Sequence, residues 1–217
     1  MDAIMDIARR HGLAVIEDTA QACGGKYQGR YLGTWGSMGC VSLDAYKVIG
    51  AGEGGIITTD DEWLYMRAQS YHDTAACWRP DRYARERKEG ELFCGENYRM
   101  PELCAAVALA QLRKLDAINT ATRAIYRQLR REIVLPRGAR WVEPLDPDGV
   151  CGYTLALLFA SNADAIKGAK AGFSGLAGGE ARGARDWHVY WHWQHIMEQK
   201  TATPEGFPFR SPYVTRL

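Results

Sequence analysis

The chain has 217 residues, of which 47% are hydrophobic and 24% charged, and its formal net charge is +1. This balance gives no electrostatic sign of nucleic-acid or anionic-membrane binding, and no apolar run has the length of a membrane span. The first residues lack the basic-then-apolar pattern of a signal peptide. The six cysteines include no Cys-x-x-Cys pair, which argues against a zinc ribbon, so free thiols in a reducing cytosol are expected.

The first predicted elements are a helix and a short apolar strand. Residues 2–11 place apolar side chains on one helical face, and Gly12 is a candidate helix stop. Residues 13–16 form a short apolar strand that acidic residues follow. This order is typical of an α/β protein with a parallel sheet, in which ligands bind beyond the carboxyl ends of the strands. Asp18 at such an end is either a ligand-binding carboxylate or the N-cap of a following helix.

A lysine at the end of a second short strand is the feature around which the chain is organised. Residues 38–43 are predicted to form this strand, and Lys47 follows between Tyr46 and a Val-Ile pair. Apolar surroundings favour the uncharged amine, the form in which a lysine acts as a nucleophile. Glycines at positions 52, 54 and 55 allow the backbone to turn sharply. From these residues alone, Lys47 is either an activated amine or a solvated loop residue.

The rest of the chain predicts further α/β elements. In chain order they are a strand at 55–59, a helix at 62–71, an irregular polar stretch at 71–96, a helix from 101 to about 132, a linker at 136–149, a strand at 153–159 and a helix at 163–171. The long helix carries an apolar stripe at Ala108, Leu112, Leu115, Ile118, Ile125 and Leu129. We therefore divide the chain into 1–120, part of a large domain, and 121–217, a bridging helix with an incomplete small α/β domain.

Several motifs occur in an order that points to one family. The chain carries Glu-Asp-Thr-Ala-Gln at 17–21, Ser-Leu-Asp-Ala-Tyr-Lys at 42–47 before a Gly-Glu-Gly-Gly turn, and Gly-Glu-Asn-Tyr-Arg at 95–99. With these motifs it resembles the sugar aminotransferases of the DegT/DnrJ/StrS type, which bind pyridoxal 5′-phosphate (PLP) in the aspartate aminotransferase fold, fold type I. The matching segments are 15–24, 29–39, 42–55, 95–102 and 110–116. The resemblance implies that residues 1–120 are the C-terminal portion of the PLP-binding large domain, a mostly parallel sheet flanked by helices.

The resemblance assigns roles to five residues. Lys47 matches the lysine that forms the Schiff base with the cofactor and then moves protons as general base and acid. Asp18 matches the carboxylate that keeps the pyridine nitrogen protonated, and Gln21 matches the residue at the ring face and its phenolic oxygen. Ser42 matches a hydroxyl donor to the cofactor phosphate, and Asn97 matches an asparagine that reaches the phosphate of the neighbouring subunit's cofactor. The last four also have ordinary alternatives as cap, strand residue or loop hydrogen-bond partners.

The resemblance also implies an activity. It predicts a cytoplasmic homodimer that transfers an amino group from an amino-acid donor, such as glutamate, to a keto sugar or nucleotide-linked keto sugar, for polysaccharide or secondary-metabolite synthesis. The form Ala-Tyr-Lys-Val-Ile is closest to members acting on amino-octulosonate-type sugars. A related branch carries histidine in place of the lysine and dehydrates its substrate, so Lys47 favours transamination. The alternatives are a PLP-dependent dehydratase or regulator and a non-catalytic remnant.

The resemblance covers only part of the family's length. It begins inside the large domain, and the upstream part of family members supplies a Gly-Thr/Ser-x-Ala phosphate loop and an aromatic residue that stacks on the pyridine ring. Neither motif appears in this chain, and the small domain ends early. We therefore expect a fragment that lacks the N-terminal part, with open strand edges.

A stretch rich in histidine and aromatic residues, at 187–195, is a separate feature. On one helix, His188, His192 and His195 would share a face at a spacing that can hold a metal. No matching carboxylate or cysteine stands nearby in the sequence, so an aromatic core or a wall of the sugar pocket is the favoured interpretation, and no metal is predicted. His72 is expected either to line the substrate cleft or to make a structural hydrogen bond.

Overall fold

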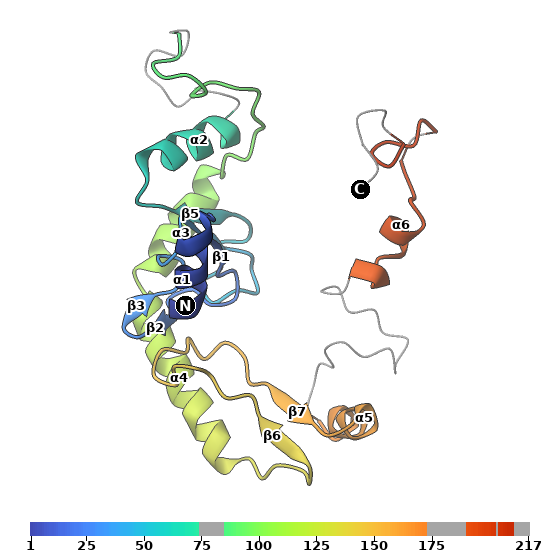
Figure 1. Ribbon diagram of the computed structural model, residues 1–217. Helices are drawn as coiled ribbons and strands as arrows, with labels where there is room; N and C mark the ends of the chain where they lie inside the picture. Colours follow the sequence, from blue (N-terminus) through green and yellow to red (C-terminus); the bar gives the residue numbers. More distant parts are fainter. Residues whose placement is uncertain (74–84, 173–189, 203, 211–217) are drawn as a thin grey trace. The chain divides into compact units, whose positions relative to one another are not determined.

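The computed structural model describes residues 1–73, 85–172, 190–202 and 204–210 (Figure 1). They belong to two compact units, Met1–Ile133 with Glu143–Leu155 and Val134–Val142 with Ala156–Leu217. The sequence-based division into domains at 1–120 and 121–217 stays a prediction. No helix among the described residues is long and apolar enough to cross a membrane.

The first unit begins with helix α1 (Asp2–His11), which ends where the sequence predicts. Gly12 has a φ of 62°, a left-handed conformation that a Cβ disfavours, and its N–H closes onto the last turn of the helix. Strand β1 (Ile16–Asp18) follows. It starts later than the predicted strand at 13–16, and Leu13 and Ile16 are 60% and 66% exposed. The predicted strand at 13–16 is therefore displaced in the structure, because only Ile16 belongs to β1, and Val15 is the one part-buried residue of the apolar run.

Strand β1 is the edge of a three-stranded sheet in the order β1–β4–β5. It pairs in parallel with β4 (Met38–Ser42). Strand β5 (Gly55–Thr58) pairs with β4 in antiparallel orientation, because the loop between them contains no crossover helix and returns the chain directly. The predicted α/β class is confirmed, with a sheet that is mixed. A separate hairpin pairs β2 (Lys26–Tyr27) with β3 (Arg30–Tyr31).

Helix α2 (Glu62–His72) follows β5 as predicted. Its N-cap is Asp61, whose Oδ1 accepts a hydrogen bond from the N–H of Leu64 at 3.0 Å. This bond satisfies one of the donors that the first turn of a helix leaves without a partner inside the helix.

The long helix predicted from residue 101 to about 132 is two helices in the structure. Helices α3 (Glu102–Leu112) and α4 (Leu115–Glu132) follow one another (Figure 1). Between them, the N–H of Lys114 bonds to the carbonyl of Gln111, three residues back, at 2.9 Å. Such a bond tightens the turn and interrupts the regular α-helical ladder.

The packed face of α4 also differs from the predicted apolar stripe. Ile125 and Leu129 of that stripe are 56% and 37% exposed, whereas Asn119 and Tyr126 are buried. Asn119 donates from Nδ2 to the carbonyl of Cys23 at 3.3 Å. A polar contact with the loop after β1 thus helps to choose the buried face, which hydrophobicity alone does not reveal.

The core of the first unit lies around the loop that follows β4. Leu43 and Ile49 are 0% exposed, and Cys23 and Ala51 are buried beside them. Partly buried side chains from the strands, from α3 and α4 and from the adjoining loops pack against this cluster: Val41, Val48, Ile56, Met100, Ala108, Leu115 and Ile118. Full burial of a leucine or isoleucine side chain contributes about 1.5–3 kcal/mol to stability. The two residues therefore hold the loop that carries Lys47 firmly.

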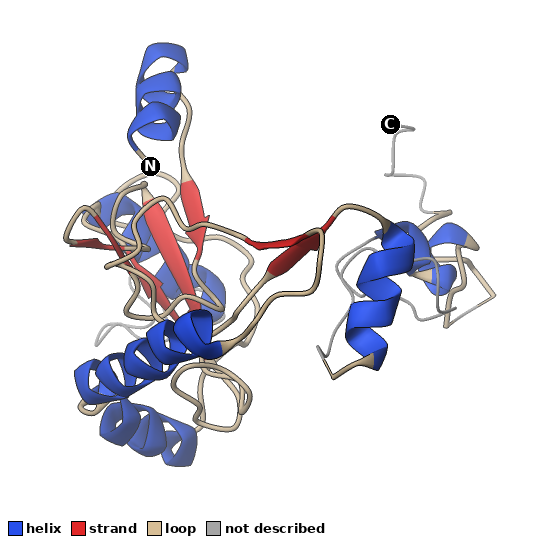
Figure 2. Cartoon of the chain, turned by 90° about the horizontal axis from the view of Figure 1, so that it is seen from below, coloured by secondary structure: helices blue, strands red, loops and turns tan. Residues whose placement is uncertain are grey.

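The second unit contains strands β6 (Ala139–Trp141) and β7 (Leu157–Phe159), which pair in antiparallel orientation (Figure 2). The predicted linker at 136–149 therefore holds a strand, and the predicted strand at 153–159 is paired only over β7. Helix α5 (Asn162–Lys170) confirms the predicted helix at 163–171, and its N-cap Ser161 accepts from the N–H of Asp164 at 3.2 Å. Two short elements follow, the 3₁₀ helix η2 (Tyr190–His192) and helix α6 (Gln194–Met197).

Candidate functional site

Asp18 and Ser42 occupy the last positions of two neighbouring parallel strands. Asp18 ends β1 and Ser42 ends β4, and Asp18 pairs in register with Cys40, just before Ser42. Both side chains lie at the carboxyl edge of the parallel pair, where ligands bind in α/β sheets. Gln21 lies in the turn directly after β1. The structure thus brings three of the predicted site residues to one edge of the sheet.

The two neighbours of Asp18 anchor it. Glu17 is 8% exposed, and its carboxylate accepts hydrogen bonds of 2.6–2.8 Å from three backbone N–H groups of the loop 33–36. Thr19 is 4% exposed, and its N–H and hydroxyl both donate to the carbonyl of Cys40, at 2.9 and 2.8 Å. The strand end that carries Asp18 is therefore tied to the loop 33–36 and to β4. Sequence reasoning did not single out Glu17 or Thr19, although an acid inside a strand is a signal of a bound partner.

Lys47 lies on a loop that backbone hydrogen bonds close tightly. Three such bonds of 2.8–3.1 Å join Leu43 to Gly54, Ala45 to Gly52, and Ala51 to Leu43. The loop therefore extends the β4–β5 pair as a compact turn. Lys47 itself is part-exposed, and its Nζ has no hydrogen-bond or ion-pair partner among the residues that the structure describes.

The free polar atoms at this edge fit the cofactor that the resemblance implies. Oδ1 of Asp18 accepts from the N–H of Ala20 at 3.0 Å, and no described residue donates to Oδ2, which is open to the N–H of a protonated pyridine ring. The Oγ of Ser42 accepts from the N–H of Asp44 at 3.3 Å, so its own hydrogen remains available for a phosphate oxygen. The amine of Lys47 has no competing carboxylate among the described residues. Carboxylate, hydroxyl and amine are the groups that PLP requires.

Asn97 lies on a different part of the first unit. It forms an isolated β-bridge with Asp73, just after α2, and its Oδ1 accepts from the N–H and the Nε of Arg99 at 3.2 and 3.1 Å. No hydrogen bond or ion pair within the described chain joins Asn97 to the other predicted site residues. The Asn97 side chain is exposed, and its Nδ2 makes no hydrogen bond to a described residue. Its role toward a neighbouring subunit stays a prediction.

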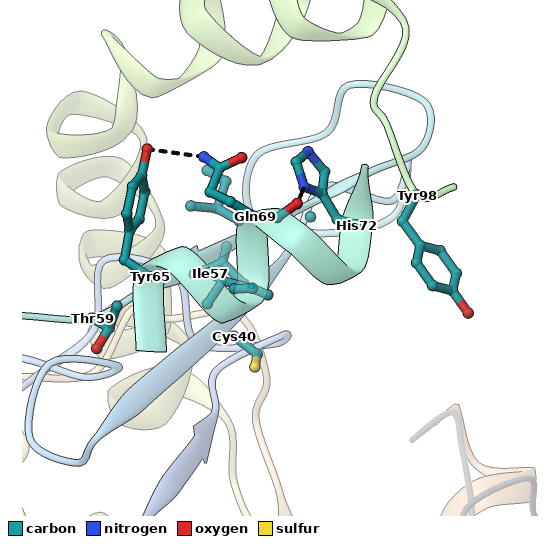
Figure 3. Close-up of a pocket in the computed structure, with 11 residues that line it drawn as sticks. Cys40, Ile57, Thr59, Tyr65, Gln69, His72 and Tyr98 are labelled. Atoms are coloured by element: carbon teal, nitrogen blue, oxygen red, sulfur yellow. Dashed lines mark hydrogen bonds between the residues drawn. The ribbon is translucent and has the colours of Figure 1, made fainter. Parts of the chain in front are cut away.

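A cavity of about 430 Å³ lies between α2 and strands β4 and β5 (Figure 3). Its lining includes Cys40 and Ile57 from the strands and Tyr65 and His72 from the helix. His72 Nδ1 lies 2.8 Å from the carbonyl oxygen of Gln69. His72 therefore makes the structural hydrogen bond that was one of its two expected roles, and it also lines this cavity. Among the described residues that line this cavity, none is one of the five predicted cofactor residues.

An aromatic cluster with one carboxylate lies at the C-terminal end of α2. The ring of Tyr71 stacks on those of Phe93 and Tyr98, with centroid distances of 6.3 and 5.9 Å. The hydroxyls of Tyr71 and Tyr98 donate to Glu96 at 3.1 and 2.7 Å. These hydrogen bonds, with the negative charge of Glu96, raise the pKa of both tyrosines, because only the protonated phenol donates.

The five described cysteines are free thiols, as predicted, and Cys77 lies outside the described residues. Burial raises the pKa of the Cys23 thiol, with a smaller effect from nearby Cys151. Cys151 contacts the loop after β1, because its Sγ donates to the carbonyl of Gln21 at 3.7 Å. The buried thiols of Cys23 and Cys151 therefore pack beside the loop that carries Gln21.

Over its described residues, 190–195, the histidine-rich stretch is not one continuous helix. His192 ends η2, and His195 lies in α6 after a break at Trp193. The ring of His195 instead stacks on Trp193 at 6.3 Å. His188 lies outside the described residues. Over the described ranges, no group of three His, Cys, Asp or Glu side chains is arranged to hold a metal.

Comparison with known proteins gives one family. The model of the DegT/DnrJ/EryC1/StrS aminotransferase family matches residues 1–152. The GDP-perosamine synthase of Escherichia coli O157:H7 is 38% identical over 125 residues, which are 58% of this chain and 32% of that protein. The chain therefore spans about a third of the length of this relative.

Two solved structures share the fold. 3-Amino-5-hydroxybenzoic acid synthase is 29% identical with a TM-score of 0.59, over 72% of this chain and 40% of that one. The E. coli GDP-4-keto-6-deoxy-D-mannose-3-dehydratase with bound hydrated PLP is 18% identical with a TM-score of 0.64, over 78% and 47% of the two chains. The expected architecture, part of the PLP-dependent transferase fold type I, is confirmed.

Proposed function

Since the chain belongs to the DegT/DnrJ/EryC1/StrS aminotransferase family, we propose that the protein transfers an amino group from an amino acid to a keto sugar. Proteins of this family depend on PLP. The donor we propose is glutamate, and the acceptor is a nucleotide-linked keto sugar, in keeping with the name of the GDP-perosamine synthase that the chain resembles. The more specific placement near amino-octulosonate sugars stays a prediction from sequence.

One observation carries this proposal. A lysine without a described ion-pair partner sits on a rigid loop directly after β4, and the end of β4 lies beside the end of β1 that presents Asp18. A PLP enzyme needs an amine and a carboxylate, and in this chain Lys47 and Asp18 follow or end two strands that pair with each other. The same edge offers the Ser42 hydroxyl as a donor.

Each side chain has a distinct task in the proposed reaction. When bound, PLP supplies an electron sink that lets a proton leave the carbon that carries the amino group. Lys47 holds the cofactor and then moves this proton as base and as acid. Asp18 keeps a proton on the pyridine nitrogen, and Ser42 donates to the phosphate. Gln21 would contact the face of the ring and its phenolic oxygen.

The proposed assembly is a cytoplasmic homodimer. In it, the free amide nitrogen of Asn97 donates to the phosphate of the cofactor in the other subunit. The exposed position of Asn97, on a segment tied to α2 and not to the β1–β4 edge, supports this role.

The likeness to a dehydratase makes dehydration the second candidate. The residue that distinguishes the two is Lys47, since the resemblance places histidine at this position in the dehydrating branch. The third candidate is a remnant that keeps the fold and does not bind PLP.

The test is addition of PLP to the purified full chain. We expect a visible absorbance band and, after borohydride reduction, a PLP adduct on the peptide that contains Lys47. Lys47→Ala should lose both signals. Lys114→Ala, which removes an exposed lysine between α3 and α4, is the matched control and should keep both.

Two results would count against the proposal. Absence of the band means that the proposed function fails for the 217-residue chain, and an adduct spread over many lysines shows non-specific reaction of PLP. With glutamate and a GDP-linked keto sugar, mass spectrometry of the product separates the two enzymes, because only transamination places a nitrogen in the sugar.

A further inference from the structure

A side chain from a distant part of the chain reaches the loop of Lys47. The hydroxyl of Tyr153 donates to the backbone carbonyl of Tyr46 at 2.9 Å. Tyr46 directly precedes Lys47, so this bond fixes the peptide group that leads into the lysine. The sequence gives no sign of it, because the two tyrosines are 107 positions apart.

The segment that carries Tyr153 is itself held in place. Three hydrogen bonds fix it: Lys26 N–H to the Gly149 carbonyl at 2.7 Å, Thr122 Oγ1 to the Cys151 carbonyl at 2.6 Å, and Cys151 Sγ to the Gln21 carbonyl at 3.7 Å. Residues 149–153 are thus tied to α4 and to the loop after β1.

The fit against α4 is close. Gly152 has a φ of 79°, and a Cβ added there would lie 2.7–2.9 Å from backbone atoms of Thr122 and Arg123. A segment packed this closely gives the Tyr153 hydroxyl a defined position. The same segment contacts the loops of two predicted cofactor residues, Gln21 and Lys47.

We propose that Tyr153 is a positioning residue for Lys47. Tyr153 fixes the Tyr46 carbonyl and thereby directs the lysine amine toward the cofactor. This inference rests on the proposed function, in which Lys47 holds PLP. Tyr153 does not touch the reacting atoms in this proposal. It limits the orientations that the Lys47 backbone samples, and a fixed orientation is what makes an amine effective in a bound complex.

The test compares Tyr153→Phe with Tyr71→Phe in the full chain. Both substitutions remove one phenolic hydrogen bond, but Tyr71 contacts Glu96 and not the lysine loop. Without PLP, hydrogen exchange of the 43–52 peptide should become about fivefold faster in Tyr153→Phe, the effect of one lost hydrogen bond. Exchange in α1 should stay unchanged, and Tyr71→Phe should match the wild type in the 43–52 peptide.

With PLP, two further readouts follow. The PLP concentration for half-saturation should rise about fivefold in Tyr153→Phe, and the pH midpoint of the visible band should move, since the lysine amine changes its placement. A purely structural role would leave that midpoint at the wild-type value.

Unchanged exchange in the 43–52 peptide, or an unchanged pH midpoint, would overturn the proposal. Faster exchange in α1 as well would also overturn it, because the variant would then be generally destabilised. If the wild-type chain takes up no PLP, the proposed function fails for this chain. The exchange measurement then still decides whether Tyr153 holds the loop.

Discussion

The hydroxyl of Thr19 donates to the carbonyl of Cys40 at 2.8 Å, immediately after β1 ends. The N–H of Thr19 bonds to the same oxygen at 2.9 Å, so one residue fixes β1 to β4 at the edge where ligands bind. Asp18 lies between this junction and the buried carboxylate of Glu17. The carboxylate that we propose for the cofactor is therefore presented by fixed backbone, which is the support that a preorganised site requires.

Thr19→Val tests this junction. The substitution keeps the shape and removes the hydroxyl, so the part-buried Cys40 carbonyl loses one of the two Thr19 donors. We expect a loss of about 1 kcal/mol in the free energy of unfolding, measured by urea denaturation. Thr154→Val, at an exposed threonine, is the control and should change the free energy by much less. Equal losses in the two variants would contradict the role given to Thr19.

Glu17→Gln tests the anchor on the other side. The glutamine amide has only one acceptor oxygen, so at least one of the three backbone N–H groups in the loop 33–36 must lose its partner. A buried unsatisfied donor costs about 1–3 kcal/mol. Glu53→Gln, at an exposed glutamate, should leave the unfolding curve almost unchanged. A Glu17→Gln variant as stable as the wild type would show that the loop does not depend on this carboxylate.

Local signals in the sequence predict some helix boundaries correctly. Contacts between distant parts of the chain determine where the long helix is interrupted and which of its faces is buried. The Gly12 stop and α2 follow from residues that are adjacent in the chain, and the structure confirms both. The break between α3 and α4 carries no proline or glycine at Arg113 and Lys114. Likewise, Ile125 continues an apolar stripe and is nonetheless 56% exposed, because α4 packs with the face that carries Asn119.

The candidate site shows the same division. Lys47 and Asp18 belong to motifs that the sequence displays, so the sequence predicts both as site residues, and their roles stay proposals. The residues that hold them act through contacts between segments far apart in the chain. Glu17 binds a loop about twenty positions away, and Tyr153 reaches Tyr46 over a still longer separation. No local pattern encodes such contacts.

Gly152→Ala tests how closely the segment 149–153 packs on α4. Gly152 and Gly29 both have a φ of 79°, but an added Cβ meets backbone within 3 Å at Gly152 and nothing within 4 Å at Gly29. Gly29→Ala therefore measures the backbone strain alone, about 1 kcal/mol. Gly152→Ala should cost about 1–3 kcal/mol more, because backbone atoms must move. Thermal and urea unfolding measure the loss of stability in both variants. Equal losses would show that the segment 149–153 accommodates the added methyl group without displacing α4.

The tyrosines beside Glu96 predict a pH effect. Their folded-state pKa values are raised above that of the unfolded chain, mainly by the hydrogen bonds to Glu96. The stabilisation is therefore fully present below the unfolded pKa and is lost as the pH rises through the folded pKa. In Glu96→Gln, both tyrosines should titrate at lower pH than in the wild type, as followed by NMR. Glu102→Gln, at an exposed glutamate, is the control and should leave both tyrosine titrations unchanged. If the two tyrosines titrate at the same pH in Glu96→Gln as in the wild type, the contact with Glu96 is contradicted.

The proposed role of Asn97 across a dimer is tested by mixing two defective variants. Lys47→Ala removes the amine, and Asn97→Ala removes the amide that we place at the neighbour's phosphate. If a site combines Lys47 of one subunit with Asn97 of the other, each mixed dimer contains one intact site, because both defects fall together in the second site. Refolding the two variants together should then restore PLP binding that neither shows to the same extent alone. If both residues serve the same subunit, every site in the mixed dimer carries one defect, and mixing restores nothing.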